Sequence, residues 1–337
     1  MIIIMKPDAR EPEIQEVISE LHDNDLKEVR MDGAERVVLA VLGDDRVLVR
    51  AKINSLSGVD RVMEVLEPYK LASREHKPEG SRIKLNGFSI GGEEIIVMAG
   101  PCSVESEEQL DRIAGEVKAA GAKILRGGAF KWRTSPHEFQ GLGLDGLRII
   151  KRVKEKHGLL SATEVLDPRQ VEAVAQYSDI LQIGTVSMQN YPLLKEAGKS
   201  KMPVILKRGK WATYKEYLLA AEYIMAEGNE NVILCERGIR TFVNETRHTM
   251  DINAIPYLKE KTHLPIVADP SHATGKRSLV AAVAKASIAA GADGILIETH
   301  YDPTQAATDA DQTISTENFA TLMSDLRKIA AAVGRTL

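Results

Sequence analysis

The stretch IVADPSH, residues 266–272, runs from an apolar segment directly into polar groups that can do chemistry, and six other segments of the chain have the same form. Helix-like stretches separate the seven segments. This alternation is typical of parallel strands joined by helices, with functional groups at the carboxyl ends of the strands. The other six segments are MAGPCS (98–103), ILRGGAFKWRTS (124–135), SATEV (161–165), VILKRG (204–209), ILCERG (233–238) and ILIETH (295–300).

Eight strand candidates after residue 94 predict a closed barrel. Several are continuously apolar, as expected when both faces of a strand are buried. Eight strand–helix units in about 240 residues match an α/β fold of the (β/α)8, or TIM, barrel type. A doubly wound open sheet is the alternative, but no G-x-G-x-x-G follows the first strand, which disfavours it. The predicted strands are 95–100, 123–129, 159–165, 179–185, 203–208, 231–236, 265–269 and 294–299, and helices are predicted at 109–120, 214–227, 278–290 and 317–333.

A smaller α+β domain is predicted at residues 1–70, because its elements follow the order of a ferredoxin-like unit. It contains no cluster of reactive side chains, so we expect it to serve packing, oligomerisation or effector binding. Residues 71–82 are polar and predict a linker. The barrel domain then occupies 83–337 and opens with a hairpin whose turn is Asn86-Gly87. The elements predicted in the first domain are strands 1–5, 27–31, 35–42 and 62–66 and helices 11–24 and 47–57.

Composition favours a globular enzyme. The 337 residues are 44% hydrophobic and 27% charged. The net charge of −4 gives no electrostatic footprint for nucleic acid, and no apolar run is long enough to span a membrane. The two cysteines, Cys102 and Cys235, do not form a disulfide framework, so a reducing cytoplasm is the expected setting.

A metal site is predicted where the barrel closes. Cys102, His272 and Glu298 follow the first, seventh and eighth predicted strands, which are neighbours in a closed barrel. Thiolate, imidazole and carboxylate together suit one divalent ion such as Mn, Fe, Co or Zn. Each residue also has an ordinary structural interpretation, but their convergence favours a metal. A fourth ligand is available in the loop after Glu298, from Asp302, Asp309 or Asp311.

Cations gather at the same end of the predicted barrel. Buried cations are costly unless an anion meets them, and five or more of them against few fixed acids favour an anionic ligand such as phosphate. Pairing with Glu164, Glu236 or Asp269 is the structural alternative for any one of them. Neighbouring strand residues face opposite ways, so only one of Lys207 and Arg208 is expected to point inward. The cations are Arg126, Lys131, Arg133, Lys207, Arg208 and Arg237, with hydroxyls at Thr134 and Ser135.

These segments resemble the 3-deoxy-D-arabino-heptulosonate 7-phosphate (DAHP) synthases, and in particular the type Iβ group with an N-terminal ferredoxin-like domain. The resemblance covers essentially the whole chain. The related octulosonate phosphate synthases share the barrel and parts of the motifs, but they have an extra residue between the lysine and the arginine of K-x-RTS. The motifs are AGPCS (99–103), LRGGAFK-x-RTSP (125–136), FQGLG (139–143), LKRG (206–209), CERGIRTF (235–242) and DPSH (269–272).

The resemblance implies a transferase of the shikimate pathway, which makes aromatic amino acids, that condenses phosphoenolpyruvate with erythrose 4-phosphate and releases phosphate. It implies a homotetramer or homodimer with no nucleic-acid or membrane partner. It also implies a role for each matching residue. The metal ligands would be Cys102, His272, Glu298 and Asp309, the phosphoenolpyruvate contacts Arg126, Lys131, Lys207 and Arg237, and the aldose-phosphate contacts Arg133, Thr134 and Ser135. The catalytic residues would be Lys131 as proton donor, Glu164 beside the attacking water, and His272.

Three positions depart from the family pattern. Val186 stands where the family has an arginine after the fourth strand, and Trp132 stands where it has proline. Val29 and Met31 replace a histidine and a serine of tyrosine-inhibited relatives. The first two departures motivate a second hypothesis, a phosphoenolpyruvate-condensing paralogue with another aldehyde. The third predicts weak or absent inhibition by tyrosine.

Two further classes of protein remain as alternatives. A metal-independent Schiff-base aldolase would use Lys131 or Lys207 as its nucleophile. A non-enzymatic amino-acid sensor would carry a decayed barrel. The retention of four dispersed metal ligands argues against the sensor. A Schiff-base aldolase would keep its activity with a chelator and would be trapped by borohydride.

Overall fold

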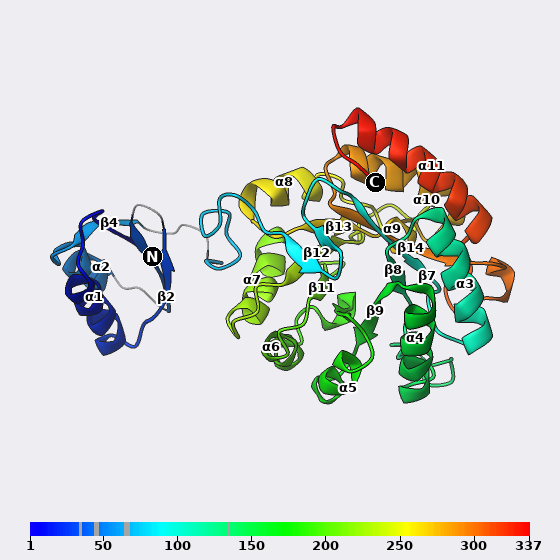
Figure 1. Cartoon of the computed structure of the whole chain (residues 1–337), viewed down its shortest axis with the longest axis horizontal. Helices are drawn as coiled ribbons and strands as arrows, with labels where there is room; N and C mark the ends of the chain where they lie inside the picture. The colour runs from blue at the N-terminus through cyan, green and yellow to red at the C-terminus, as the bar shows by residue number, and fades with distance from the viewer. Residues whose placement is uncertain (34–35, 44–46, 64–67, 134) are drawn as a thin grey trace. The chain divides into compact units, whose positions relative to one another are not determined.

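The computed structural model describes residues 1–33, 36–43, 47–63, 68–133 and 135–337. The chain divides into two compact units, Met1–His76 and Lys77–Leu337 (Figure 1). None of the described helices is long and apolar enough to cross a membrane.

The first unit is an antiparallel sheet with two helices. Its strands lie in the order β2-β3-β1-β4, which is the ferredoxin-like arrangement that the sequence predicts. Ile3, Val17 and Leu39 are fully buried in a core that the sheet shares with α1. The elements are β1 (Ile2–Met5), α1 (Glu11–Asp23), β2 (Lys27–Asp32), β3 (Val37–Leu42), α2 (Val47–Asn54) and β4 (Val59–Met63).

Strand β4 begins three residues earlier than the predicted start at residue 62. Gly58 adopts a φ of +81°, which L-residues rarely allow, and turns the chain directly into the sheet. Val59 then pairs with Met5 beside an irregularity in the register of β1. The predicted end of this strand falls on residues 64–67, outside the described residues.

The second unit contains the predicted TIM barrel. Eight parallel strands lie in chain order from β7 to β14, and the pairing of β14 with β7 closes the ring. A short strand that the sequence did not predict, β15 (Ile314–Ser315), pairs in parallel with the last two residues of β14. The barrel strands are β7 (Ile96–Gly100), β8 (Ile124–Arg126), β9 (Leu160–Val165), β10 (Ile180–Ile183), β11 (Val204–Lys207), β12 (Val232–Glu236), β13 (Ile266–Ala268) and β14 (Gly294–His300).

Helices surround the strands as an outer layer (Figure 1). Side-chain caps begin several of them: Ser106 accepts from the backbone of Gln109 at the start of α3, and Thr213 forms a capping box with Glu216 at the start of α7. The helices are α3 (Glu107–Ala120), α4 (Leu144–His157), α5 (Val171–Ala175), α6 (Tyr191–Lys199), α7 (Tyr214–Met225), α8 (Ala254–Lys261), α9 (Pro270–Thr274), α10 (Arg277–Ala289) and α11 (Thr316–Ala332), with short 3-10 turns η1 (Pro168–Gln170), η2 (Thr185–Ser187) and η3 (Pro303–Gln305).

A hairpin seals the end of the barrel at which the strands begin. Strands β5 (Ile83–Leu85) and β6 (Phe88–Ile90) pair across the turn at Asn86-Gly87. Ile83 and Ile90 pack into the same buried cluster as Ile96, Ile205 and the other inward residues of the barrel. Because this end is filled with apolar side chains, polar chemistry is confined to the carboxyl ends of the strands.

Candidate active site

A cavity of about 500 Å³ opens at the carboxyl ends of the barrel strands. Its walls carry more cations than acids, which predicts that it receives an anion. The loops after β8, β10, β11 and β12 supply most of the lining. The cationic residues of the wall are Arg126, Lys131, Arg133, Lys207, Lys210, Arg237 and Arg247, and the acidic ones are Glu138, Glu164 and Asp309.

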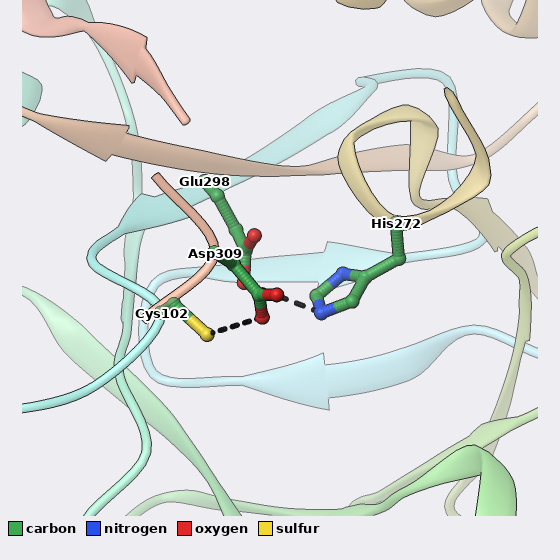
Figure 2. Close-up of side chains that lie close together, drawn as sticks. All are labelled: Cys102, His272, Glu298 and Asp309. Atoms are coloured by element: carbon green, nitrogen blue, oxygen red, sulfur yellow. Dashed lines mark hydrogen bonds and ion pairs between the residues drawn. The ribbon is translucent and has the colours of Figure 1, made fainter. Parts of the chain in front are cut away.

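Four potential metal ligands converge at one side of this cavity (Figure 2). Cys102 follows β7, His272 lies on α9 after β13, Glu298 ends the apolar part of β14, and Asp309 comes from the loop after η3. One ligand atom from each lies within 4.8 Å of the others. Strands β7 and β14 pair directly, with Glu298 opposite Gly100, so barrel closure itself brings the two ends of the sequence together.

The loop holds Asp309 in an unusual backbone conformation that points it into this cluster. Its φ is +51°, a left-handed value that aspartate tolerates better than most residues. The carbonyl of Asp309 accepts from the backbone of Gln312 and from the hydroxyl of Thr313, at 3.2 and 2.9 Å. Asp302 instead accepts from Thr304, and neither Asp302 nor Asp311 joins the cluster of four.

Electrostatics keep the imidazole ready to bind a metal. Burial lowers the pKa of His272, so the ring is neutral near pH 7. Its Nδ1 lies 2.6 Å from Oδ2 of Asp269, while Nε2 faces Oε1 of Glu298 at 3.3 Å. A carboxylate behind the ring is the usual way in which proteins orient a metal-binding histidine. The arrangement leaves Nε2 for the ion.

The thiol of Cys102 is protonated in this geometry. Burial, together with the negative charge of Glu298, raises its pKa to about 12. It donates to Oδ2 of Asp309 at 3.0 Å, and Nζ of Lys131 lies 3.0 Å from the sulfur. Despite burial, the surrounding imidazole and guanidinium groups lower the pKa of Glu298 and Asp309. A thiol, a neutral imidazole and two carboxylates form a donor set that fits one first-row divalent ion.

Most cavity cations already have a partner in the protein. Arg126 reaches Glu298 at 3.0 Å, and Lys207 reaches Asp269 at 2.6 Å. Burial alone would lower the pKa of Lys131, but Cys102 and Glu164 raise it above its usual value, so its ammonium keeps its proton. Arg208 is turned away from the cavity and pairs with Glu236 and Asp251, as strand alternation requires.

Arg237 differs from these cations. Its guanidinium is buried at the cavity wall, yet its Nε and Nη1 have no hydrogen-bond partner among the described residues. Burial removes water from the charged guanidinium and so lowers the pKa of Arg237. A buried guanidinium without an acceptor is costly in free energy. This residue therefore offers two N–H groups to an anionic ligand.

Glu164 reaches the cavity because Gly184 has no side chain. A Cβ at Gly184 would lie 1.9 Å from Oε1 of Glu164, so no other residue fits there without displacing the carboxylate. Gly184 is the single residue between the end of β10 and the start of η2. The missing side chain at Gly184 thus lets the carboxylate of Glu164 lie at the cavity wall, on a strand between those of Arg126 and Lys207.

The structure brings together all the predicted site residues that it describes. Arg126, Lys131, Arg133, Ser135, Glu164, Lys207, Arg237, His272 and Asp309 line the cavity, and Cys102 and Glu298 lie behind them in the ligand cluster. Thr134, predicted as an aldose-phosphate contact, lies outside the described residues. The departures Val186 and Trp132 also line the cavity, and both are largely exposed, at 40% and 54%.

Sequence reasoning missed five polar residues of the wall. Glu138 lies in the loop after β8 and pairs with Arg133. Lys210 directly follows the LKRG motif, and Gln182 lies on β10 itself. Arg247 and His248 belong to the loop after β12, which returns to the site by pairing with Ala273 and Thr274. In the sequence, only the adjacent cation and imidazole of Arg247 and His248 indicated that this loop could belong to the site. Burial beside Arg237 lowers the pKa of His248 to about 4.

A barrel with this cation-lined cavity and a candidate metal cluster is, as a class, a TIM-barrel enzyme for phosphorylated anions. The comparisons with known proteins give its family. Residues 72–333 match the DAHP synthetase I family, and residues 1–67 match the DAHP synthase ferredoxin-like domain. The chain belongs to the DAHP synthetase I family.

Relatives along the whole chain support the assignment. Phospho-2-dehydro-3-deoxyheptonate aldolase of Thermotoga maritima is 45% identical over 334 residues, 99% of both chains. A crystal structure of that DAHP synthase covers 99% of this chain and 98% of its own, with a TM-score of 0.79 and 44% identity. A 2-dehydro-3-deoxyphosphooctonate aldolase of Geotalea uraniireducens is 30% identical over 74% of this chain and 98% of its own.

Proposed function

We infer that this enzyme is a DAHP synthase, a transferase that condenses phosphoenolpyruvate with erythrose 4-phosphate and releases phosphate in the first step of the shikimate pathway. The observation that carries the inference is the full-length match, at 45% identity, to a phospho-2-dehydro-3-deoxyheptonate aldolase. The match includes both the barrel and the ferredoxin-like domain. The octulosonate relatives match less closely, at 28–31% identity, and over 72–74% of the chain.

Phosphoenolpyruvate is proposed to bind deep in the cavity, between Arg126, Lys131, Lys207 and Arg237. These residues come from β8, β11 and β12 and their loops, and the unpartnered N–H groups of Arg237 support the proposal. Arg133 and Ser135, with Thr134, are proposed to hold the phosphate of the aldose. Arg133 now pairs with Glu138 at 2.9 Å, an exposed acid that a phosphate can replace.

Cys102, His272, Glu298 and Asp309 are proposed to hold one divalent ion, which is Mn, Fe, Co or Zn. When bound, such an ion supplies a Lewis acid that polarises the aldehyde carbonyl. The protein places the ligand cluster directly beside Lys131. The aldehyde end of the second substrate is therefore expected to lie next to both the cluster and the ammonium.

The chain's own groups then perform the proton and positioning steps. The cations hold two mutually repelling phosphorylated substrates in reacting geometry. The methylene carbon C3 of phosphoenolpyruvate forms a bond to the aldehyde carbon C1 of erythrose 4-phosphate, and Lys131 donates its proton to the resulting alkoxide. Water adds at C2, with Glu164 proposed beside it, and the bond between C2 and the phosphate oxygen breaks to release phosphate.

A second candidate function is condensation of phosphoenolpyruvate with a different aldehyde. The observation that favours it is the position of Val186 and Trp132, which both line the cavity. The bulk of Trp132 lies beside Arg133 in the proposed aldose-phosphate loop, so it can alter which aldehyde fits.

The first prediction concerns the substrate pair. With Mn²⁺ present, we expect the protein to release phosphate from phosphoenolpyruvate fastest when erythrose 4-phosphate is the aldehyde. The measurement is phosphate release with a panel of aldose phosphates of four to six carbons. Faster turnover with another aldehyde would establish the second candidate. A chelator should abolish activity and borohydride should trap no adduct, because a Schiff-base lysine plays no part in this reaction.

The second prediction concerns the ferredoxin-like domain, which we propose to serve control or assembly into a homotetramer or homodimer. A chain that starts at Lys70 should keep turnover within about threefold, because every proposed site residue lies in the second compact unit. A truncated Thermotoga maritima DAHP synthase has been crystallised, and it covers 80% of this chain at 44% identity.

Turnover and light scattering of full-length and truncated protein test this proposal. Tyrosine should inhibit the full-length protein weakly or not at all, because Val29 and Met31 on β2 offer no polar side chain. Loss of turnover after truncation, or strong inhibition by tyrosine, would contradict the respective part.

A further inference from the structure

Two of the seven cavity cations have no carboxylate or thiol partner among the described residues. They are Arg237, whose Nε and Nη1 are unpartnered, and Lys210, whose charged neighbours are the cations Arg240, Arg237 and Arg247. The other five are each held by the protein: Arg126 by Glu298, Lys131 by Cys102, Arg133 by Glu138, Lys207 by Asp269 and Arg247 by Asp309. The unpaired cations mark the part of the wall that still requires an anion.

The backbone at Lys210 is held by hydrogen bonds to two neighbouring segments. The backbone N–H of Gly209 points to Sδ of Met188 at 3.0 Å, which ties the loop after β11 to the segment after β10. The carbonyl of Lys210 accepts from the backbone of Arg240 at 2.7 Å, which ties it to the loop after β12. Its ammonium lies 5.6 Å from the ring centre of Trp211, within cation–π range. The side chain lines the cavity, and its loop contacts the segment that follows Val186 and the loop that follows Arg237.

Val186 leaves this side of the wall without charge. It belongs to η2, the turn that ends directly before Met188, and it lines the same cavity as Lys210. Valine cannot bind an anion, and Gly184, Thr185 and Ser187 around it bring no charge. Burial lowers the pKa of Lys210, and the positive charges of Arg240 and Arg237 lower it further. Such mutual repulsion is relieved when an anion binds between the cations.

We propose that Lys210 and Arg237 together form the subsite for the phosphate group of phosphoenolpyruvate. Lys210 supplies, from the loop after β11, the positive charge that Val186 does not supply from the loop after β10. This assignment rests on the proposed function and extends it by naming a substrate-binding residue outside the motifs of the family. Erythrose 4-phosphate carries the same phosphate monoester chemistry, so the experiment must separate the two substrates.

The test is Lys210→Met in the full-length, metal-loaded protein. A charge-assisted hydrogen bond contributes about 1.5–3 kcal/mol, so the KM for phosphoenolpyruvate should rise about 10- to 100-fold. The KM for erythrose 4-phosphate and kcat should change less than about twofold. Calorimetric titration with inorganic phosphate alone should show a similar loss of affinity without any turnover. Lys215→Met is the matched control, because Lys215 is exposed on α7 and does not line the cavity.

A rescue variant tests whether a positive charge from the loop after β10 can replace the charge that Lys210 supplies from the loop after β11. Adding Val186→Arg to Lys210→Met should restore the KM for phosphoenolpyruvate to within about threefold of wild type, because the arginine enters the same wall from the other side. If Lys210→Met unfolds at a lower temperature than wild type, Lys210→Gln replaces it in the same measurements, because glutamine removes the charge but keeps a polar side chain.

The possible outcomes separate the proposals. An unchanged KM for phosphoenolpyruvate with unchanged phosphate affinity overturns the assignment of Lys210, even if wild type condenses the expected substrates. A rise confined to the KM for erythrose 4-phosphate overturns it in favour of the aldose phosphate. If Val186→Arg does not restore the KM for phosphoenolpyruvate in Lys210→Met, the claim that Lys210 replaces a charge at position 186 is overturned. If wild type does not condense the pair at all, the proposed function fails, while the phosphate titrations still decide whether Lys210 binds phosphate.

Discussion

Replacing Cys102 with alanine is expected to abolish turnover and to weaken metal binding by more than about 100-fold. Loss of a group that only orients a metal ligand costs 10- to 100-fold in affinity, so loss of a ligand itself should cost more. Inductively coupled plasma analysis of dialysed protein gives the metal content. With Co²⁺, the sulfur-to-metal absorption band of wild type should be absent from the variant.

Cys235→Ala is the matched control for this prediction. Cys235 is the second free cysteine and is fully buried, but it lies in the apolar interior of the barrel among Ile205, Ile233 and Val267. Its replacement should reduce stability modestly and leave metal content and turnover intact. Normal metal content and turnover in Cys102→Ala would refute the assignment of the cluster.

Metal binding by wild type should also release about one proton near pH 7. The thiol of Cys102, with its pKa raised to about 12 by burial, is protonated without the ion and must lose that proton to coordinate. The imidazole of His272 is already neutral, and the carboxylates are already ionised. Affinity should therefore rise with pH, by up to about tenfold per unit. Calorimetry in buffers of different ionisation enthalpy counts the proton, which should disappear in Cys102→Ala.

Replacing Lys131 with methionine is expected to lower kcat at saturating substrate by about 10²- to 10⁴-fold, the usual contribution of a positioned proton donor. Its ammonium lies 3.0 Å from the sulfur of Cys102, where the alkoxide is expected to form. The KM for phosphoenolpyruvate should rise as well, because the residue is also a proposed phosphoenolpyruvate contact. The metal content should not fall, since Lys131 is a neighbour of the ligand cluster and not a member of it.

Lys151→Met controls for the loss of a lysine from this part of the barrel. Lys151 is exposed on α4, the helix that follows the loop of Lys131, and does not line the cavity. We expect it to behave as wild type in kcat and both KM values. A Lys131→Met protein with an undiminished kcat would exclude Lys131 as the proton donor, even if its KM values rose.

Much of the architecture could be predicted because it follows from local patterns. The eight apolar runs and the helical stretches between them specify the barrel, and each strand boundary lies within about three residues of its prediction. The predicted strand at residues 62–66 began too late, because a single glycine with a positive φ moved its start. Strand β15 was missed, since two residues that pair after a loop leave no periodic signal.

The sequence alone determined which chemical groups reach the active end of the barrel. A residue that follows an apolar strand must lie at the strand's carboxyl end, so Cys102, Arg126, Lys207 and Arg237 were identifiable from position. The sequence could not choose among Asp302, Asp309 and Asp311 by spacing, because loop conformation is not periodic. In the structure, Asp309 joins the cluster because its left-handed backbone turns it toward Cys102 and because the pairing of β7 with β14 brings Cys102 and Glu298 together.

Only the tertiary structure decided which cations are free to bind. Lys207 and Arg208 are adjacent and alike in charge, yet one lines the cavity and the other is held outside it by Glu236 and Asp251. Lys210 lies at the wall because Met188 and Arg240 fix its loop. These two residues lie 22 positions before Lys210 and 30 after it in the sequence. Partners that lie in different loops are brought together by barrel closure, and no local pattern of residues encodes them.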